Sequence, residues 1–118
     1  MNEPWPVELR LAKDKKQLTV SFEDGFSCVL AAEYLRVESP SAEVKGHGPG
    51  QEQLVFGKRG VGILRLEPVG AYAVRIVFDD GHSTGLYTWS YLARLGREHD
   101  AIWKEYLAKL ESQGRSRG

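Results

Sequence analysis

The sequence predicts an α+β fold, in which antiparallel β-hairpins form a pseudo-duplicated strand–turn–strand–helix arrangement with a C-terminal amphipathic helix. Three observations favour this fold. Several short segments alternate apolar and polar residues, as half-buried strands do. Two acid–glycine turns, at residues 23–25 and 79–81, favour hairpins because glycine accepts positive φ. Near the end of the chain an apolar stripe has helical spacing, formed by Trp103, Tyr106, Leu107 and Leu110.

In the first half, alternation predicts strands at residues 7–11, 18–22 and 26–30, followed by a short helical segment at 31–36. Ser39 and Pro40 favour the start of another helix, because serine caps helix N-termini and proline fits the first helical position. Residues 45–60 are expected to form a loop, because their first part is rich in glycine.

In the second half, strands are expected at residues 61–67, 71–78 and 82–87, with a turn at 68–70. Thr88 caps a predicted helix that Gly96 ends. Asp100 is the predicted N-cap of the last helix. We expect a single domain over residues 5–111, with disordered ends at 1–4 and 112–118.

The two halves contain a similar stretch of sequence. Residues 20–36 resemble residues 76–94. Phe22, Asp24 and Gly25 match Phe78, Asp80 and Gly81, and Tyr34-Leu35 matches Tyr91-Leu92 after one inserted residue. An internal duplication explains the match, because it extends beyond the turn. The alternative is that two hairpins converged on the same turn chemistry.

Composition excludes several classes of protein. The 118 residues carry 16 Lys and Arg against 16 Asp and Glu, so bulk charge favours neither nucleic acid nor a membrane surface. One cysteine permits no intrachain disulfide. No apolar run approaches the ~20 residues of a membrane span, and the N-terminus lacks secretory-signal features. We therefore expect a cytoplasmic protein, either a monomer or a weak homo-oligomer.

One cluster could carry chemistry. Asp79, Asp80 and His82 could hold a metal or form an acid–base pair, although aspartates in tight turns often serve only the turn. Cys28 and the three histidines lack the close spacing of zinc sites. The glycine-rich segments at 46–50 and 57–60 lack the phosphate-binding patterns, and no nucleophile elbow is present. We therefore expect no enzyme.

Aromatic and basic residues predict a contact surface for a protein partner, since Trp and Tyr often anchor interfaces. The candidates are His47, Lys58, Arg59, His82, Trp89 and Tyr91. Trp5 is a further residue that could be exposed. Nucleic-acid binding through Lys58, Arg59, Arg65 and Arg75 is a weaker alternative, which the zero net charge disfavours.

Longer stretches resemble a known family. LTVSFEDG at 18–25, AEYLRVESPSAEV at 32–44, GHGPG at 46–50 and the run from Pro68 to Leu92 resemble the DUF971 family, also called the gamma-butyrobetaine hydroxylase-like N-terminal domain. The resemblance covers about residues 5–110, and the chain looks like the stand-alone bacterial form. In the hydroxylases this module precedes the oxygenase domain and is not the catalytic part. The resemblance therefore implies a non-catalytic binding or adaptor module.

The resemblance also implies where a zinc would lie. The family's module holds zinc through a Cys-x-Cys-x-x-Cys run and one downstream histidine. Here Ser39, Ser41 and Val44 stand at the cysteine positions, and only His82 matches. Because structural zinc needs four ligands, we expect neither this zinc nor another cofactor.

A related module occurs in proteins of iron–sulfur cluster assembly. The alternative function is therefore a metal-dependent or iron–sulfur-assembly-linked protein. Its site would lie near Asp79, Asp80 and His82, with Glu38 as a further weak ligand candidate.

Overall fold

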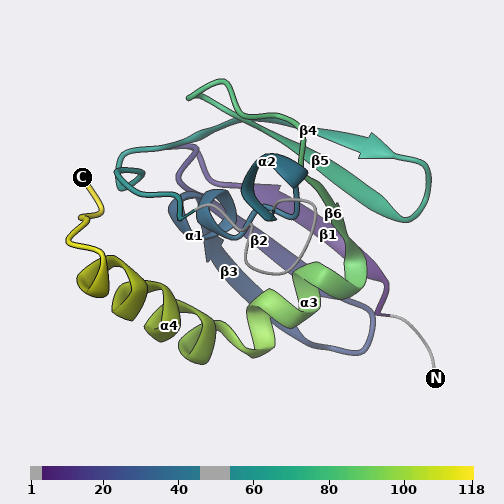
Figure 1. Cartoon of the computed structure of the whole chain (residues 1–118). Coiled ribbons are helices and arrows are strands. Elements are labelled where there is room, and N and C mark those ends of the chain that lie inside the picture. Colours follow the sequence, from purple (N-terminus) through teal and green to yellow (C-terminus); the bar gives the residue numbers. More distant parts are fainter. Residues whose placement is uncertain (1–3, 46–53) are drawn as a thin grey trace.

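Two three-stranded antiparallel sheets form the framework of the chain, and helices follow each of them (Figure 1). The computed structural model describes residues 4–45 and 54–118. The first half forms β1 (Pro6–Leu11), β2 (Gln17–Phe22), β3 (Ser27–Ala31), α1 (Ala32–Val37) and α2 (Ala42–Lys45). The second half forms β4 (Ile63–Val69), β5 (Ala73–Phe78), β6 (Leu86–Thr88), α3 (Trp89–Arg97) and α4 (His99–Ser112). This arrangement confirms the predicted α+β fold with a C-terminal helix.

The two acid–glycine turns have the same geometry. The N–H of Phe22 donates to the carbonyl of Phe26 at 2.8 Å, and the N–H of Phe78 donates to that of His82 at 2.9 Å. Gly25 and Gly81 have φ values of +94° and +93°, a region that side chains with a Cβ rarely adopt. These glycines therefore set both turns.

Each sheet also has a β-bulge at the same place in its first strand. The register shifts at Val7, beside the pairing with Phe22, and at Leu64, beside the pairing with Phe78. A bulge leaves one residue unpaired in the ladder. Both bulged side chains are exposed, Val7 by 64% and Leu64 by 55%. The likeness of the halves thus extends to β1 and β4, which the matching sequence stretch did not include.

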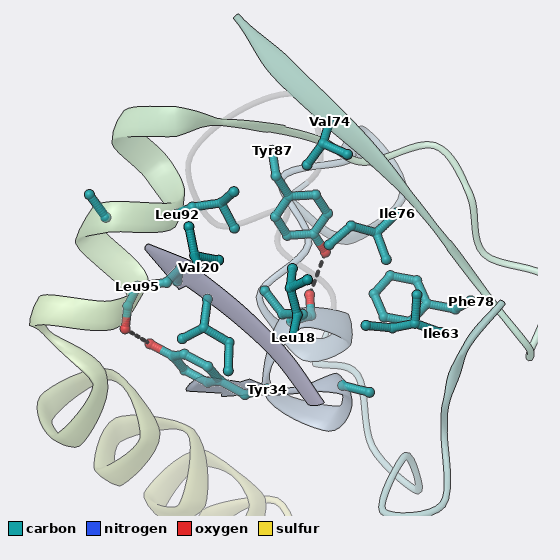
Figure 2. Close-up of a cluster of buried hydrophobic side chains, with 14 of the residues drawn as sticks. Leu18, Val20, Tyr34, Ile63, Val74, Ile76, Phe78, Tyr87, Leu92 and Leu95 are labelled. Carbon is teal, nitrogen blue, oxygen red and sulfur yellow. Dashed lines mark hydrogen bonds between the residues drawn. The ribbon is translucent and has the colours of Figure 1, made fainter. Parts of the chain in front are cut away.

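One apolar core joins the two sheets with α1 and α3 (Figure 2). Leu18 and Val20 of β2 and Val74 and Ile76 of β5 are buried in it, each with 1% exposure or less. Burying a side chain of this size contributes ~1.5–3 kcal/mol, so this core dominates the stability of the fold. A smaller cluster holds α4 and contains Val37, Tyr106 and Leu110, with Leu54, Val55 and Trp103 packed against it.

The helices of the two halves are joined by reciprocal hydrogen bonds. The hydroxyl of Tyr34 in α1 donates to the carbonyl of Leu95 in α3 at 2.8 Å (Figure 2). The hydroxyl of Tyr91 in α3 donates to the carbonyl of Glu38, which ends α1. In each case the acceptor is the fourth residue after the other half's tyrosine, so the two contacts are equivalent.

Several helix boundaries differ from the sequence expectation. Thr88 caps α3 as predicted, and its hydroxyl accepts from the N–H of Tyr91. Ser39 and Pro40 do not begin a helix. Instead Ser39 Oγ accepts from the N–H of Ser41, and α2 starts at Ala42. Gly96 lies inside α3 rather than ending it.

The N-cap position of α4 is Glu98, and Asp100 lies in the first turn of that helix. Three other segments differ from the expectation. Pro68 and Val69 pair within β4 rather than turning, and residues 82–85 are not strand. Ser112 ends α4, and residues 113–118 are held against the domain by contacts described below, whereas the sequence indicated disorder there. Residues 1–3 of the expected N-terminal disorder lie outside the described residues.

None of the described helices has the length and apolar character needed to cross a bilayer.

Candidate functional site

Asp80 is the centre of a charged cluster. Its Oδ2 lies 2.8 Å from Arg36 Nε and 2.6 Å from Lys58 Nζ, and its Oδ1 accepts from the N–H of His82 at 3.0 Å. Burial raises the pKa of the Asp80 carboxyl, but the bonds from Lys58, from the His82 main chain and from Arg36 outweigh it and lower the pKa to about 2. A carboxyl with this pKa is ionised near neutral pH and cannot act there as a general acid.

His82 is buried beside Ser39. Its Nε2 lies 2.8 Å from Ser39 Oγ, and the two residues are 6% and 0% exposed. A Cβ on Gly85 would collide with Ser39 Oγ, so the segment between the turn and β6 packs closely against Ser39. The imidazole is enclosed in the fold, which disfavours the predicted partner contact through His82.

The four positions at which the resemblance implies zinc ligands lie in the same buried region. Ser41 and Val44 are 6% and 4% exposed, and Ser41 Oγ lies 2.6 Å from Thr84 Oγ1, two residues beyond His82. Two hydroxyls and an aliphatic side chain do not supply the thiolates or imidazoles that structural zinc requires. The residues present therefore do not fit the family's zinc, and the Ser39–His82 hydrogen bond links two of its positions.

The other metal candidates do not complete a site. The main-chain carbonyl of Glu38 accepts from Tyr91, and Asp79 is an exposed turn residue whose N–H donates to the carbonyl of Gly62. In residues 4–45 and 54–118, no group of three or more His, Cys, Asp or Glu side chains could hold a metal ion. Of the metal ligands proposed from the sequence, Asp80 and His82 are in contact, and that contact is a hydrogen bond from the main-chain N–H of His82 to the Asp80 carboxylate.

Three of the remaining candidates for partner contacts form hydrogen bonds or an ion pair within the chain. Trp89 is half-buried and its Nε1 donates to the carbonyl of Ala71 at 2.9 Å, while Tyr91 is half-buried and bonds to Glu38. Lys58 is paired with Asp80, whereas Arg59 is exposed. His47 lies outside the described residues.

Most of the basic residues suggested for nucleic-acid binding form ion pairs with carboxylates of the chain. Arg65 lies 2.8 Å and Arg75 3.5 Å from carboxylate oxygens of Glu67. With Lys58 paired to Asp80, three of these four cations have carboxylate partners, which weakens a phosphate-binding surface.

A groove with a volume of about 780 Å³ lies between the first acid–glycine turn and α3. It is lined by Pro4, Trp5, Glu23, Asp24, Ser90, Ala93, Arg94, Arg97 and Glu98. Trp5 is 48% exposed on its wall. Trp5 could be identified from the sequence as a residue that could be exposed, but its position beside α3 could not, because the two segments are far apart in the chain.

The comparisons with known proteins agree with the fold. A family model described as gamma-butyrobetaine hydroxylase-like, N-terminal, matches residues 9–93. Two solution NMR structures are each 46% identical over 98% of this chain, covering 91% and 86% of their own chains with TM-scores of 0.85 and 0.84.

A crystal structure from Acidithiobacillus ferrooxidans, of a protein of unknown function in the DUF971 family, is also similar. It is 41% identical over 76% of this chain and 90% of its own, with a TM-score of 0.64. No curated protein matches the chain. The family match and these structures together show that the chain belongs to the gamma-butyrobetaine hydroxylase-like N-terminal (DUF971) family.

Proposed function

We propose that this chain is a non-catalytic binding module that docks a segment of a protein partner in the Trp5 groove. The observation that carries the proposal is the exposed indole of Trp5 on the wall of the groove. Tryptophan is enriched among the residues that dominate binding energy at interfaces. A groove of about 780 Å³ is of the size that ligand-binding clefts have.

The charges of the groove indicate the chemistry of its partner. Asp24 lies 3.2 Å from Arg97, and Arg94 lies 3.6 Å from Glu98, so these four charges are paired. Within the described residues, the carboxylate of Glu23 has no ion-pair partner. A partner segment that brings a cationic side chain to Glu23 and an apolar side chain to Trp5 would complement this surface.

The side chains that were candidates for catalysis or metal binding make contacts within the fold. Asp80 accepts hydrogen bonds from two cations, and His82 lies against Ser39. Burial raises the pKa of the Cys28 thiol, although Arg97 opposes the shift, and a protonated thiol is a poor ligand for a cluster. These observations favour the binding module over the iron–sulfur alternative. The cytoplasmic location remains a prediction, which cell fractionation would test.

We also infer that the domain arose by internal duplication. The equivalent turns, the equivalent bulges and the reciprocal tyrosine bonds support this origin. So do the ion pairs at the turns, since Asp24 pairs with Arg97 of α3 and Asp80 pairs with Arg36 of α1. Each half's turn is thus bound by an arginine from the other half's helix. Convergence of two hairpins would explain the turns but not these crossed contacts.

Selection from a displayed library of random peptides tests the binding function. We expect enriched peptides to combine a basic and an apolar residue, and to lose at least about tenfold in affinity for the Trp5→Ala and Glu23→Gln variants. Val7→Ala is the matched control, because Val7 lies in β1 two residues after Trp5 and is exposed, but it does not line the groove. Its affinity should be unchanged.

Two results would overturn the proposal. One is enrichment of peptides that bind Trp5→Ala as well as they bind the unaltered chain, or no enrichment at all. The other is a stoichiometric metal or cluster in native mass spectra of protein purified anaerobically without chelator, with that mass lost in His82→Ala. The second result would favour the metal-dependent alternative.

A further inference from the structure

The segment 113–118 turns back from the end of α4 through a defined helix-ending motif. Gly114 has a φ of +64°, its N–H donates to the carbonyl of Glu111, and the N–H of Arg115 donates to the carbonyl of Leu110. This pair of bonds is the Schellman motif, in which glycine is favoured because the left-handed conformation is costly for other residues. The motif directs the following residues back toward α1 and the loop before β4.

Arg117 anchors this segment at a nearly buried carboxylate. Its Nε and Nη2 lie 2.9 Å and 2.7 Å from the two carboxylate oxygens of Glu33, whose side chain is 8% exposed. The guanidinium also lies over the ring of Trp103, 5.3 Å from its centroid. A bidentate arginine–carboxylate pair with a cation–π contact is geometrically selective, and lysine cannot reproduce it.

Two main-chain hydrogen bonds complete the contact. The N–H of Gly57 donates to the carbonyl of Ser116 at 3.0 Å, and the N–H of Arg59 donates to that of Arg117 at 2.8 Å. Apart from Arg117, the side chains of residues 113–118 are exposed. The site therefore binds one arginine side chain and the main chain beside it. Any extended peptide with a suitably placed arginine can supply both.

We propose that Glu33, Trp103 and the N–H groups of Gly57 and Arg59 form a docking site for an extended, arginine-bearing segment of a protein partner, which residues 113–118 occupy in this chain as an internal competitor. The occupant's chemistry follows from the segment already seated there. The proposal rests on the proposed function only in treating the chain as a binding module. The site is separate from the Trp5 groove, because the two are lined by different residues.

The tether makes the internal segment a strong competitor. A short link gives it an effective concentration of about a millimolar or more, so a separate peptide binds much more weakly while the internal arginine is seated. Glu33 would then be a nearly buried carboxylate without its cation, a state that is costly and that an incoming arginine relieves.

Binding of a synthetic peptide to the full-length chain tests the site. The probe is the peptide QGRSRG, which has the sequence of residues 113–118, titrated to millimolar concentration into the Arg117→Ala variant. The readout is the indole N–H NMR signal of Trp103, with those of Trp5 and Trp89 as internal references. We expect a saturable shift of the Trp103 signal alone, and at least about tenfold weaker binding to the unaltered chain.

Matched controls isolate the interaction. Arg115 lies over Phe56 and does not touch Glu33 in the structure, so the Arg115→Ala variant keeps its internal arginine and should bind as weakly as the unaltered chain. Adding Glu33→Gln to Arg117→Ala should abolish the shift, as should a peptide with both arginines replaced by alanine.

The absence of a Trp103 shift in folded Arg117→Ala would overturn the proposal, and so would a shift that survives Glu33→Gln. If Arg117→Ala does not fold, Gly114→Ala provides the second test. It keeps Arg117 but opposes the helix-ending motif, so it should raise the affinity for the peptide. Unchanged affinity in Gly114→Ala would then contradict the proposal. Neither outcome bears on the Trp5 groove, whose test uses other residues and another readout.

Discussion

The hydroxyl of Tyr34 donates a 2.8 Å hydrogen bond to the carbonyl of Leu95, and so ties α1 to α3 across the core. Tyr34→Phe should lower the free energy of unfolding by about 1 kcal/mol, because the buried carbonyl loses a donor while the ring still fills its space. Tyr91→Phe should have a similar effect through Glu38. Urea denaturation measures both. Tyr72→Phe is the control, since Tyr72 is 55% exposed, and equal stability of all three variants would contradict the structural role.

Gly96→Ala should destabilise the domain although alanine normally favours a helix interior by ~0.5–1 kcal/mol over glycine. A Cβ at this position would lie 2.6 Å from Cys28 Sγ and 3.0 Å from Cys28 Cβ, where α3 packs on β3. We expect a loss of about 1–3 kcal/mol, the usual cost of overpacking.

A double-mutant cycle measures that contact. Cys28→Ala removes the sulfur, so it should recover part of the loss caused by Gly96→Ala, leaving the contact with Cβ. Strictly additive effects of the two substitutions would show that the contact is not the cause.

Stability should fall in acid through the protonation of Asp80. Its pKa is about 2 in the folded chain, below the ordinary value of 3.8, because the bonds from Lys58, the His82 main chain and Arg36 outweigh burial. The stabilisation is therefore present above pH 3.8 and lost as the pH falls toward 2. Because Asp80 is partly exposed, solvent screens these charges and the contribution to stability is about 1 kcal/mol.

Asp80→Asn should remove this component and flatten the decrease between pH 4 and pH 2, as followed by chemical denaturation at each pH. Asp79→Asn is the matched control in the same turn and should keep the decrease. If Asp80→Asn leaves the pH dependence of the free energy of unfolding unchanged, the loss of stability in acid comes from other carboxyls.

Introducing cysteines at the three positions that the resemblance implies should create a zinc site. Ser39 and His82 are in contact and Ser41 and Val44 are buried in the same region, so the triple variant Ser39→Cys, Ser41→Cys, Val44→Cys would offer three thiolates and one imidazole. We expect one zinc per chain in native mass spectra and a higher melting temperature with zinc. Adding His82→Ala should weaken the site. If the triple variant folds and takes up no zinc, the four positions do not converge as the structure indicates.

Local sequence patterns predicted the elements well where short-range physics decides them. Alternation located the strands because one face of each is buried, and Gly25 and Gly81 marked the turns because they need positive φ. Thr88 marked a helix start because its hydroxyl can accept from the main chain three residues on.

The same patterns were wrong where tertiary contacts compete with them. Gly96 is a helix-ending residue by propensity, yet it continues α3 because only a residue without a side chain fits against Cys28. Pro68 lies in the edge strand β4, where a missing N–H is tolerated. Gly114 could have indicated that the chain turns back after α4, since glycine commonly follows a helix end.

The sequence by itself determined the class of the fold, the likeness of its halves and the family, because these depend on residue types and their spacing. Only the tertiary structure decided what the polar residues do. His82 lies against Ser39, Asp80 binds Arg36 and Lys58, and Glu33 holds Arg117, each across 22 or more residues of chain. Such pairings depend on which segments the shared core brings together, and that is set by packing of the whole chain rather than by any local pattern.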